Sequence, residues 1–144
     1  MQMGHDVPFA FNRKEAKDHG EGGTLVGAPL KGKVLIIDDV ISAGTSVRES
    51  VELIRAQGAE PAGVIIALDR MERGGDAVNP TENSAVHDVK QTYGLEVISI
   101  ANLNGLLQWL NEQAQTSSAE PHSAHADLQR HAQAVQAYRE RWGA

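Results

Sequence analysis

VLIIDDVISAGTS, residues 34–46, decides the fold. A short apolar block rich in β-branched residues ends in two adjacent carboxylates, Asp38 and Asp39, and a loop of small residues follows. Because the block has no polar alternation, it predicts a strand buried on both faces. Ligands of open α/β sheets bind at the carboxyl ends of the strands, so the two acids and the loop form a candidate site.

The loop at residues 42–46 (SAGTS) favours phosphate binding. It can point several backbone N–H groups and hydroxyls at one spot, with the positive end of a helix dipole behind them. Carboxylates touching a phosphate would repel it, so Asp38 and Asp39 are expected to accept hydrogen bonds from sugar hydroxyls or to hold Mg²⁺ nearby. Together these features indicate a ribose 5-phosphate site. Taken one at a time, the loop also fits an ordinary strand-to-helix turn, and the two acids also fit a solvated pair at a strand end.

Strands alternate with helices on either side of this loop, which predicts an α/β fold with a parallel sheet, right-handed crossovers and flanking helices. Ser46 and Glu49 match a capping box, and Gly58 and Gly94 are helix stops. Residues 71–84, rich in Gly, Pro and Asn, read as a mobile surface loop. The expected elements are strands at 33–39, 63–69 and 95–100 and helices at 46–58, 84–93 and 102–111.

The chain is expected to divide into a core at residues 1–113, a polar linker at 114–123 and a helix at 124–144 that packs back on the core. The last helix is predicted from a stripe formed by Leu128, Val135, Tyr138 and Trp142. Trp109 and Trp142 lie on apolar helical stripes, so core packing is expected for both.

Composition excludes several classes of function. The net charge of -6 over 144 residues gives no general support for binding nucleic acid. No apolar run approaches the length of a membrane span. With no cysteine and no basic and apolar leader at the start, a cytoplasmic protein is expected.

Residues 34–46 resemble the phosphoribosyl pyrophosphate (PRPP) motif of the type I phosphoribosyltransferases. VPFAFNRKEAKDHGEGGTLVG, residues 7–27, is similar to the catalytic lid of the orotate phosphoribosyltransferases, and the similarity continues through LDRMERG, GLEVISI and AYRERWG. The resemblance covers nearly all of the chain. It implies a parallel-sheet type I phosphoribosyltransferase core that transfers phosphoribosyl from PRPP to orotate with Mg²⁺, giving orotidine 5′-monophosphate and pyrophosphate in pyrimidine biosynthesis.

On composition alone, residues 11–23 (FNRKEAKDHGEGG) read as a solvated hairpin, because their basic and acidic side chains balance. As a lid they would meet the negative charge that grows on departing pyrophosphate. The resemblance assigns this contact to Arg13, Lys14, Lys17 and His19, acting in the neighbouring subunit's site of a homodimer. His19 could also donate a proton to the leaving oxygen.

The resemblance also implies the substrate contacts. Asp38 and Asp39 would hold the ribose hydroxyls, and Arg70 would contact the orotate carboxylate or ring, which suits a planar cationic fork. The 5-phosphate would bind Ala43, Gly44, Thr45 and Ser46, with Ser42 standing where the family often has threonine.

The family's N-terminal hood and first β-α-β unit have no counterpart before the lid. The strand carrying Asp38 and Asp39 is therefore expected to lose a neighbour and to leave apolar surface exposed. Two alternatives to an active orotate phosphoribosyltransferase stay open. One is a truncated, non-catalytic fragment that binds PRPP or dimerises, and the other is a type I phosphoribosyltransferase acting on a different base.

Overall fold

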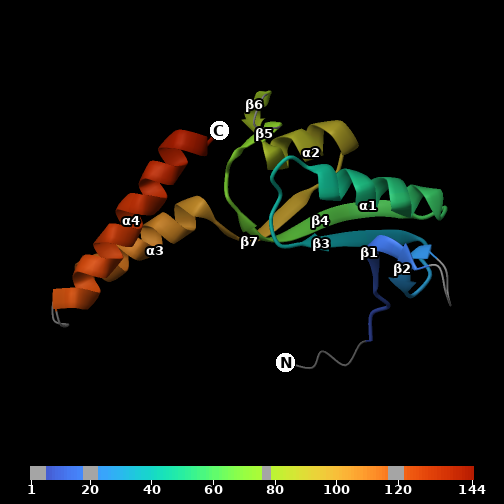
Figure 1. The fold of residues 1–144 in the computed structure, drawn as a ribbon, viewed down its shortest axis with the longest axis horizontal. Helices are drawn as coiled ribbons and strands as arrows, with labels where there is room; N and C mark the ends of the chain where they lie inside the picture. Colours follow the sequence, from blue (N-terminus) through green and yellow to red (C-terminus); the bar gives the residue numbers. More distant parts are fainter. Residues whose placement is uncertain (1–5, 18–22, 76–78, 117–121) are drawn as a thin grey trace.

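A parallel sheet lies at the centre of the molecule (Figure 1). The computed structural model describes residues 6–17, 23–75, 79–116 and 122–144. Strands β3 (Lys33–Asp38), β4 (Glu60–Asp69) and β7 (Val97–Asn102) pair in the order β3-β4-β7, all parallel. Helices α1 (Thr45–Ala56) and α2 (Ala85–Tyr93) lie in the β3–β4 and β4–β7 connections. The predicted alternation and parallel pairing are confirmed.

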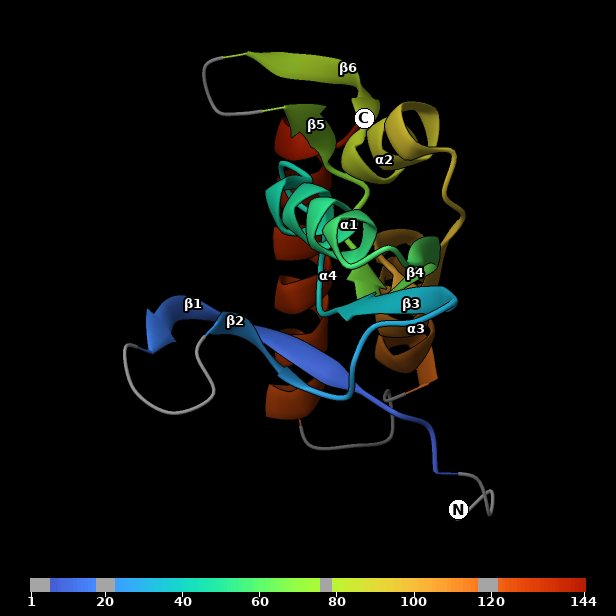
Figure 2. The ribbon, with the colours of Figure 1, turned by 90° about the vertical axis from the view of Figure 1, so that its right-hand side faces the viewer.

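Both connecting helices cover the same face of this sheet (Figures 1 and 2). The side chains between helices and sheet are aliphatic, as the apolar stripe of α1 predicts. Val47, Val51 and Ile66 are completely or almost completely removed from solvent. The rest of this core comes from Ile36, Ile41, Ile54, Ala59, Val64, Ala85, Val89 and Leu95.

The opposite face of the sheet carries exposed aliphatic side chains. Ile37 is 76% exposed, Ile98 62% and Ile100 81%. Strand β3 is also an edge strand, since β4 is its neighbour on one side and the described residues place no strand on the other. The prediction of a strand buried on both faces is therefore wrong, because nothing in the described chain covers this side, and the expected edge and apolar surface are present.

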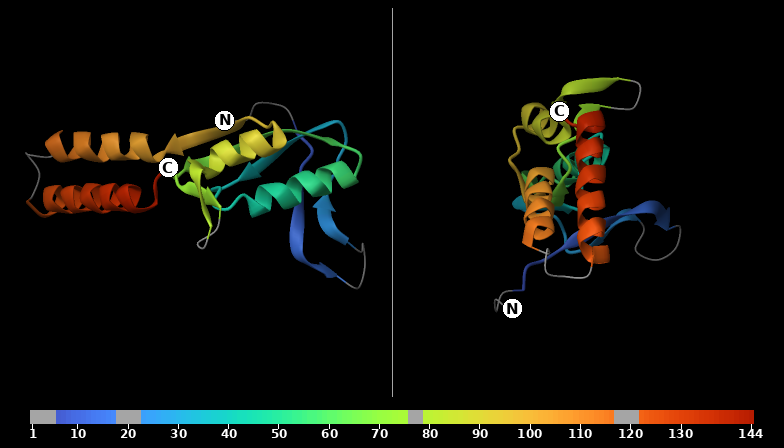
Figure 3. Two further views of the ribbon diagram at one scale, coloured as in Figure 1. Left: turned by 90° about the horizontal axis from the view of Figure 1, so that it is seen from above. Right: turned by 90° about the vertical axis from the view of Figure 1, so that its left-hand side faces the viewer.

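The stretch expected to act as a lid contains two antiparallel strands, β1 (Ala10–Lys17) and β2 (Gly23–Gly27), which form a hairpin. Phe11 pairs with Val26, and the register shifts before Lys17. The hairpin lies beside the start of β3 and the end of α1 (Figures 1 and 3). It is therefore remote from the first turn of α1.

The described parts of residues 71–84 contain regular structure. β5 (Arg73–Gly75) and β6 (Pro80–Ser84) pair antiparallel, so the expectation of an irregular loop was wrong for these residues. The backbone at residue 75 has a positive φ of 82°, a conformation that Gly75 adopts without strain. The following helix agrees with prediction: the Ser84 hydroxyl accepts a 3.2 Å hydrogen bond from the His87 N–H, and Gly94 ends α2 in the left-handed region.

Helices α3 (Leu103–Thr116) and α4 (His122–Trp142) lie side by side and project beyond the sheet (Figure 3). Both helices reach into the expected 114–123 linker. Their contact buries Leu107, Leu110 and Ala132, whereas Trp109 and Trp142 are about half exposed, so core packing of the tryptophans was a wrong prediction. Within the described segments, no helix is long and apolar enough to cross a membrane.

Candidate functional site

The acid pair lies at the carboxyl end of β3, as predicted. The Asp38 carboxylate accepts hydrogen bonds from the Asp39 N–H at 2.9 Å and from the Ser46 hydroxyl at 2.8 Å. The Asp39 carboxylate accepts the Val40 N–H at 2.7 Å and remains exposed. One oxygen of Asp38 is thus tied to helix α1, while Asp39 is turned to solvent and available to a ligand.

The loop before α1 keeps the start of the helix open. Gly44 is the N-cap residue, in the left-handed region with φ 71° and ψ 8°, and its carbonyl accepts the Arg48 N–H at 3.0 Å. Throughout this described loop and first turn, no side chain caps the helix and no acidic residue is present. The free N–H groups and the helix dipole therefore favour an anion at this position.

The predicted capping box does not form. Helix α1 already begins at Thr45, so Ser46 lies inside the first turn rather than ahead of it. Its hydroxyl donates to Asp38 instead of accepting a backbone N–H. The same serine that a local pattern assigns to capping therefore orients the acid pair.

Arg70 at the end of β4 joins this loop from a distant part of the sequence. Its Nη2 donates to the Ser42 hydroxyl and forms a 2.8 Å ion pair with Glu72. The Arg70 side chain is 30% exposed, and its Nε is buried without a partner among the described residues. The guanidinium thus lies beside the phosphate-type loop, where a planar anionic or carbonyl group can meet a rigid set of donors.

Residues 69–73, which include Arg70, are called the Arg70 strap. The Asp69 carboxylate accepts the Met71 N–H at 2.8 Å. Met71 has φ 54°, a left-handed conformation that costs a non-glycine residue about 1–2 kcal/mol. The sequence predicted a role for Arg70 but none for Asp69 and Glu72. The four charged side chains within LDRMERG (residues 68–74) could have indicated that these neighbours interact with Arg70.

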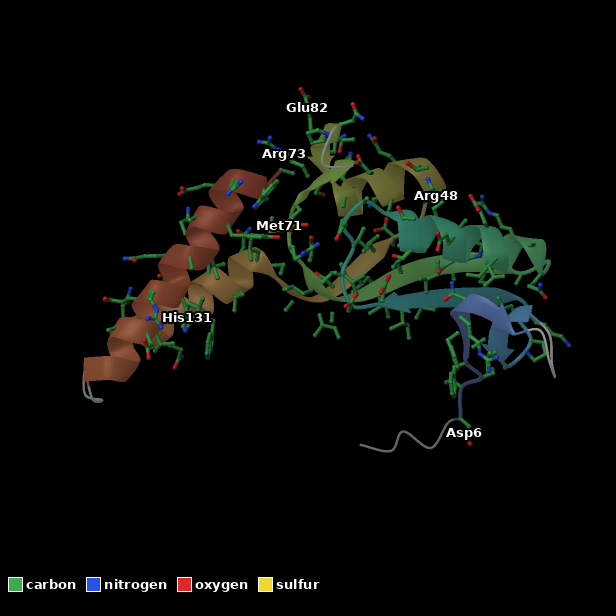
Figure 4. All side chains as sticks on the ribbon, viewed as in Figure 1. Asp6, Arg48, Met71, Arg73, Glu82 and His131 are labelled. Carbon is green, nitrogen blue, oxygen red and sulfur yellow. The ribbon has the colours of Figure 1, made fainter. Side chains whose placement is uncertain are left out.

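A groove of about 680 Å³ opens next to this loop. It separates the site from the end of α4, and Figure 4 places Met71 and Arg73 on the side of the core that faces this helix. Arg141 lies over the Trp142 ring, 4.8 Å from its centroid. The groove is lined by Ser42, Ala43, Glu72, Arg73, Gly74, Gly75, Pro80, Tyr138, Arg141 and Trp142.

The predicted substrate contacts lie at and just after the carboxyl ends of β3 and β4, and of the predicted lid residues only the Arg13 side chain is described. Ser46 is hydrogen-bonded to Asp38, and Ser42, in the same loop region, is hydrogen-bonded to Arg70. Arg13 lies on β1, and the β1–β2 hairpin lies beside the end of α1 (Figure 1). The side chains of Lys14 and Lys17 and the whole of His19 lie outside the described residues.

Mg²⁺ fits the donor set at this site only as a partly hydrated ion. Among the described residues, no three His, Cys, Asp or Glu side chains are grouped to hold a metal. Mg²⁺ commonly binds one or two carboxylates and takes its remaining ligands from water and substrate phosphates. Asp38 and Asp39 satisfy that weaker requirement.

Curated proteins similar to this chain share one name. Orotate phosphoribosyltransferase of Bordetella bronchiseptica is 63% identical over 142 residues, which cover 97% of this chain and 57% of the relative. The enzyme of the same name from Chromobacterium violaceum is 63% identical, with 99% and 58% covered. The chain thus spans somewhat over half the length of the curated relatives it matches.

Solved structures agree with these relatives. Orotate phosphoribosyltransferase of Francisella tularensis superposes with a TM-score of 0.67 at 28% identity, covering 100% of this chain and 60% of the other. Leishmania donovani UMP synthase gives a TM-score of 0.56 at 26% identity, covering 94% and 24%.

The family model described as the phosphoribosyl transferase domain matches residues 2–90. That span runs from the lid hairpin through the acid pair and the Arg70 strap into α2, and it exceeds half of the 144 residues. On this match the chain belongs to the phosphoribosyl transferase domain family.

Proposed function

We propose that this chain is the catalytic core of an orotate phosphoribosyltransferase. The reaction forms a bond between a ring nitrogen of orotate and the anomeric carbon of PRPP, breaks the bond from that carbon to pyrophosphate, and yields orotidine 5′-monophosphate for pyrimidine biosynthesis. The observation that carries the proposal is the contact of Arg70 with Ser42, which places a planar guanidinium beside the loop whose open helix start favours an anion. Relatives at 60–63% identity carry this enzyme's name.

PRPP would bind along the end of β3. The open first turn of α1, residues 43–46, would receive the 5-phosphate, because N–H groups at a helix start attract anions. Asp38 and Asp39 would accept hydrogen bonds from the ribose hydroxyls. The Ser46 bond to Asp38 supports this assignment, because it fixes one carboxylate beside the phosphate position.

Orotate would bind against Arg70. Its carboxylate matches a planar guanidinium that can donate two parallel hydrogen bonds. The Ser42 hydroxyl and the Glu72 carboxylate hold the guanidinium before the ligand arrives, so little side-chain freedom would be lost on binding.

The lid would serve a neighbouring subunit of a homodimer. Negative charge develops on pyrophosphate as the bond to the ribose breaks, and the cations Arg13, Lys14 and Lys17 would stabilise it, with His19 as proton donor. The position of the β1–β2 hairpin at the far end of α1 supports action on another subunit (Figure 3).

Mg²⁺ would be held near Asp38 and Asp39. When bound, the ion neutralises charge on the phosphate oxygens of PRPP and so favours pyrophosphate as a leaving group. The protein's own contribution is to fix the ribose and to place cations at the departing group. A cytoplasmic location is part of the proposal, supported by the absence of cysteine from the sequence.

The test is orotate consumption by the purified chain with PRPP and Mg²⁺, followed by the loss of orotate absorbance. Arg70→Gln should lower kcat/KM for orotate about 100-fold or more, since a charged hydrogen-bond pair is lost. Arg55→Gln is the matched control, because Arg55 lies exposed in the last turn of α1, away from the site. Equal activity of Arg70→Gln and Arg55→Gln would contradict the assigned base site.

Lys17→Ala tests the lid in the same assay and should abolish turnover while leaving PRPP binding largely intact. Preferential turnover of a purine base by the chain would instead favour a phosphoribosyltransferase of another specificity.

A second candidate is a PRPP-binding chain without turnover of its own. It is favoured by the exposed apolar face of Ile37, Ile98 and Ile100. Calorimetric titration separates the two: PRPP binding with no product formed supports the second candidate, and turnover eliminates it.

A further inference from the structure

The residues that follow α4 are bonded to the Arg70 strap. The Ala144 N–H donates to the Met71 carbonyl at 3.0 Å, and the Arg73 Nε–H donates to the Gly143 carbonyl at 3.0 Å. Glu72 and Gly143 also form an antiparallel β-bridge. Segments about seventy positions apart in sequence therefore share a short piece of sheet.

These bonds lead directly to the base-recognition residue. Glu72, paired by its backbone with Gly143, holds the Arg70 guanidinium through its carboxylate at 2.8 Å. Arg70 in turn donates to Ser42 of the phosphate-type loop. The contacts thus run without interruption from the end of α4 to the site.

The strap needs outside support to keep its shape. Met71 adopts a left-handed backbone conformation that a non-glycine side chain disfavours, and such conformations persist where the surrounding bonds impose them. The Asp69 carboxylate holds the Met71 N–H, and Ala144 holds the Met71 carbonyl. Helix α2 supplies a further anchor, since the Ala85 N–H donates to the Glu72 carbonyl at 3.0 Å.

We propose that Gly143 and Ala144 are positioning residues for Arg70, acting through the Arg70 strap. Loss of their bonds releases Met71 and Glu72, and the guanidinium then samples orientations that do not match a planar carboxylate. The α3–α4 pair thereby contributes to recognition of the base without touching it. The consequence for orotate rests on the proposed function, whereas the consequence for the strap does not.

Ala144→Pro isolates one bond, because proline has no N–H to donate to Met71. Ala144→Gly is the matched control, since it keeps the N–H and removes only a methyl group. Removal of residues 143 and 144 deletes all three contacts. Glu140→Ala, which removes only an exposed hydrogen bond with Gln136 on α4, controls for a general effect on the helix.

The first measurement is amide hydrogen exchange of each protein. In Ala144→Pro and in the shortened chain, exchange at Met71 and Ala85 should accelerate about 3- to 10-fold, as expected for the loss of supporting hydrogen bonds. The amides of β3 and α1 should keep their rates, as should all amides in Ala144→Gly and Glu140→Ala. Unchanged exchange in the strap of both altered proteins overturns the proposal.

The second measurement uses orotate turnover. Ala144→Pro should raise KM for orotate about 3- to 10-fold, while kcat and KM for PRPP stay within about twofold of those of the unaltered chain. Ala144→Gly should keep the KM for orotate of the unaltered chain. An equal loss in all parameters would indicate a merely structural role and would overturn the proposal. If the unaltered chain turns over no orotate, the proposed function fails, and hydrogen exchange alone decides whether these residues position the strap.

Discussion

Two glycines at opposite ends of α1 allow backbone strain to be separated from function. Gly44 has φ 71° and Gly58 has φ 74°. A Cβ atom added at Gly58 would meet nothing within 4 Å, and one added at Gly44 would meet only Val89 Cγ2 at 3.6 Å, an ordinary contact. Alanine at either position should therefore lower the free energy of unfolding by the left-handed penalty alone, about 1–2 kcal/mol.

Thermal unfolding and PRPP titration of both variants test this reasoning. A penalty of this size lowers Tm by about 2–8 °C for a chain of this length. Only Gly44→Ala should weaken PRPP binding, because relaxing its backbone turns the N–H groups at the start of α1 away from the phosphate. Equal PRPP affinity in the two variants would refute the phosphate-cradle assignment, and a loss above about 4 kcal/mol at Gly44 alone would refute the steric argument.

Three further outcomes follow from the contacts. Ser46→Ala should weaken PRPP binding in calorimetry while lowering stability by no more than about 1 kcal/mol, because the lost bond to Asp38 is exposed. Ile66→Ala should cost about 2–5 kcal/mol in denaturant unfolding, since this side chain is fully buried, whereas the matched Ile100→Ala, at 81% exposure, should stay within about 0.5 kcal/mol. Threonine at Ile98 and Ile100 should reduce binding of the dye ANS, which reports exposed apolar surface, and an unchanged dye signal would count against an open face.

Local sequence was sufficient for the elements around the phosphate-type loop. The apolar block before Asp38, the stripe of α1 and the Ser84 cap of α2 each use signals within a few residues of one another. Even there, the start of α1 was misassigned by the Ser46–Glu49 pattern. Gly44, in the left-handed region, is the N-cap, so the helix begins one residue before Ser46. The Ser46 hydroxyl donates to the charged Asp38 carboxylate instead of capping the helix.

Contacts between distant segments could not be predicted in the same way. Ser42 and Arg70 are 28 positions apart, and their meeting depends on the register of β3 against β4. The bridge from Glu72 to Gly143 depends on the return of α4 along α3. The exposure of Trp109 had no local signal either, because an apolar helical stripe does not say whether another element covers it.

The pleat of β3 separates the site from the open face of the sheet. Successive side chains of a strand point to opposite faces, so Asp38 shares its side with the buried Ile36, and the exposed Ile37 points the other way. The Asp38 hydrogen bond to Ser46 of α1 agrees with this orientation. A polar substitution at Ile37 therefore changes the apolar face without entering the acid pair's surroundings, and any polypeptide that covers this face leaves the phosphate-type loop open to its ligand.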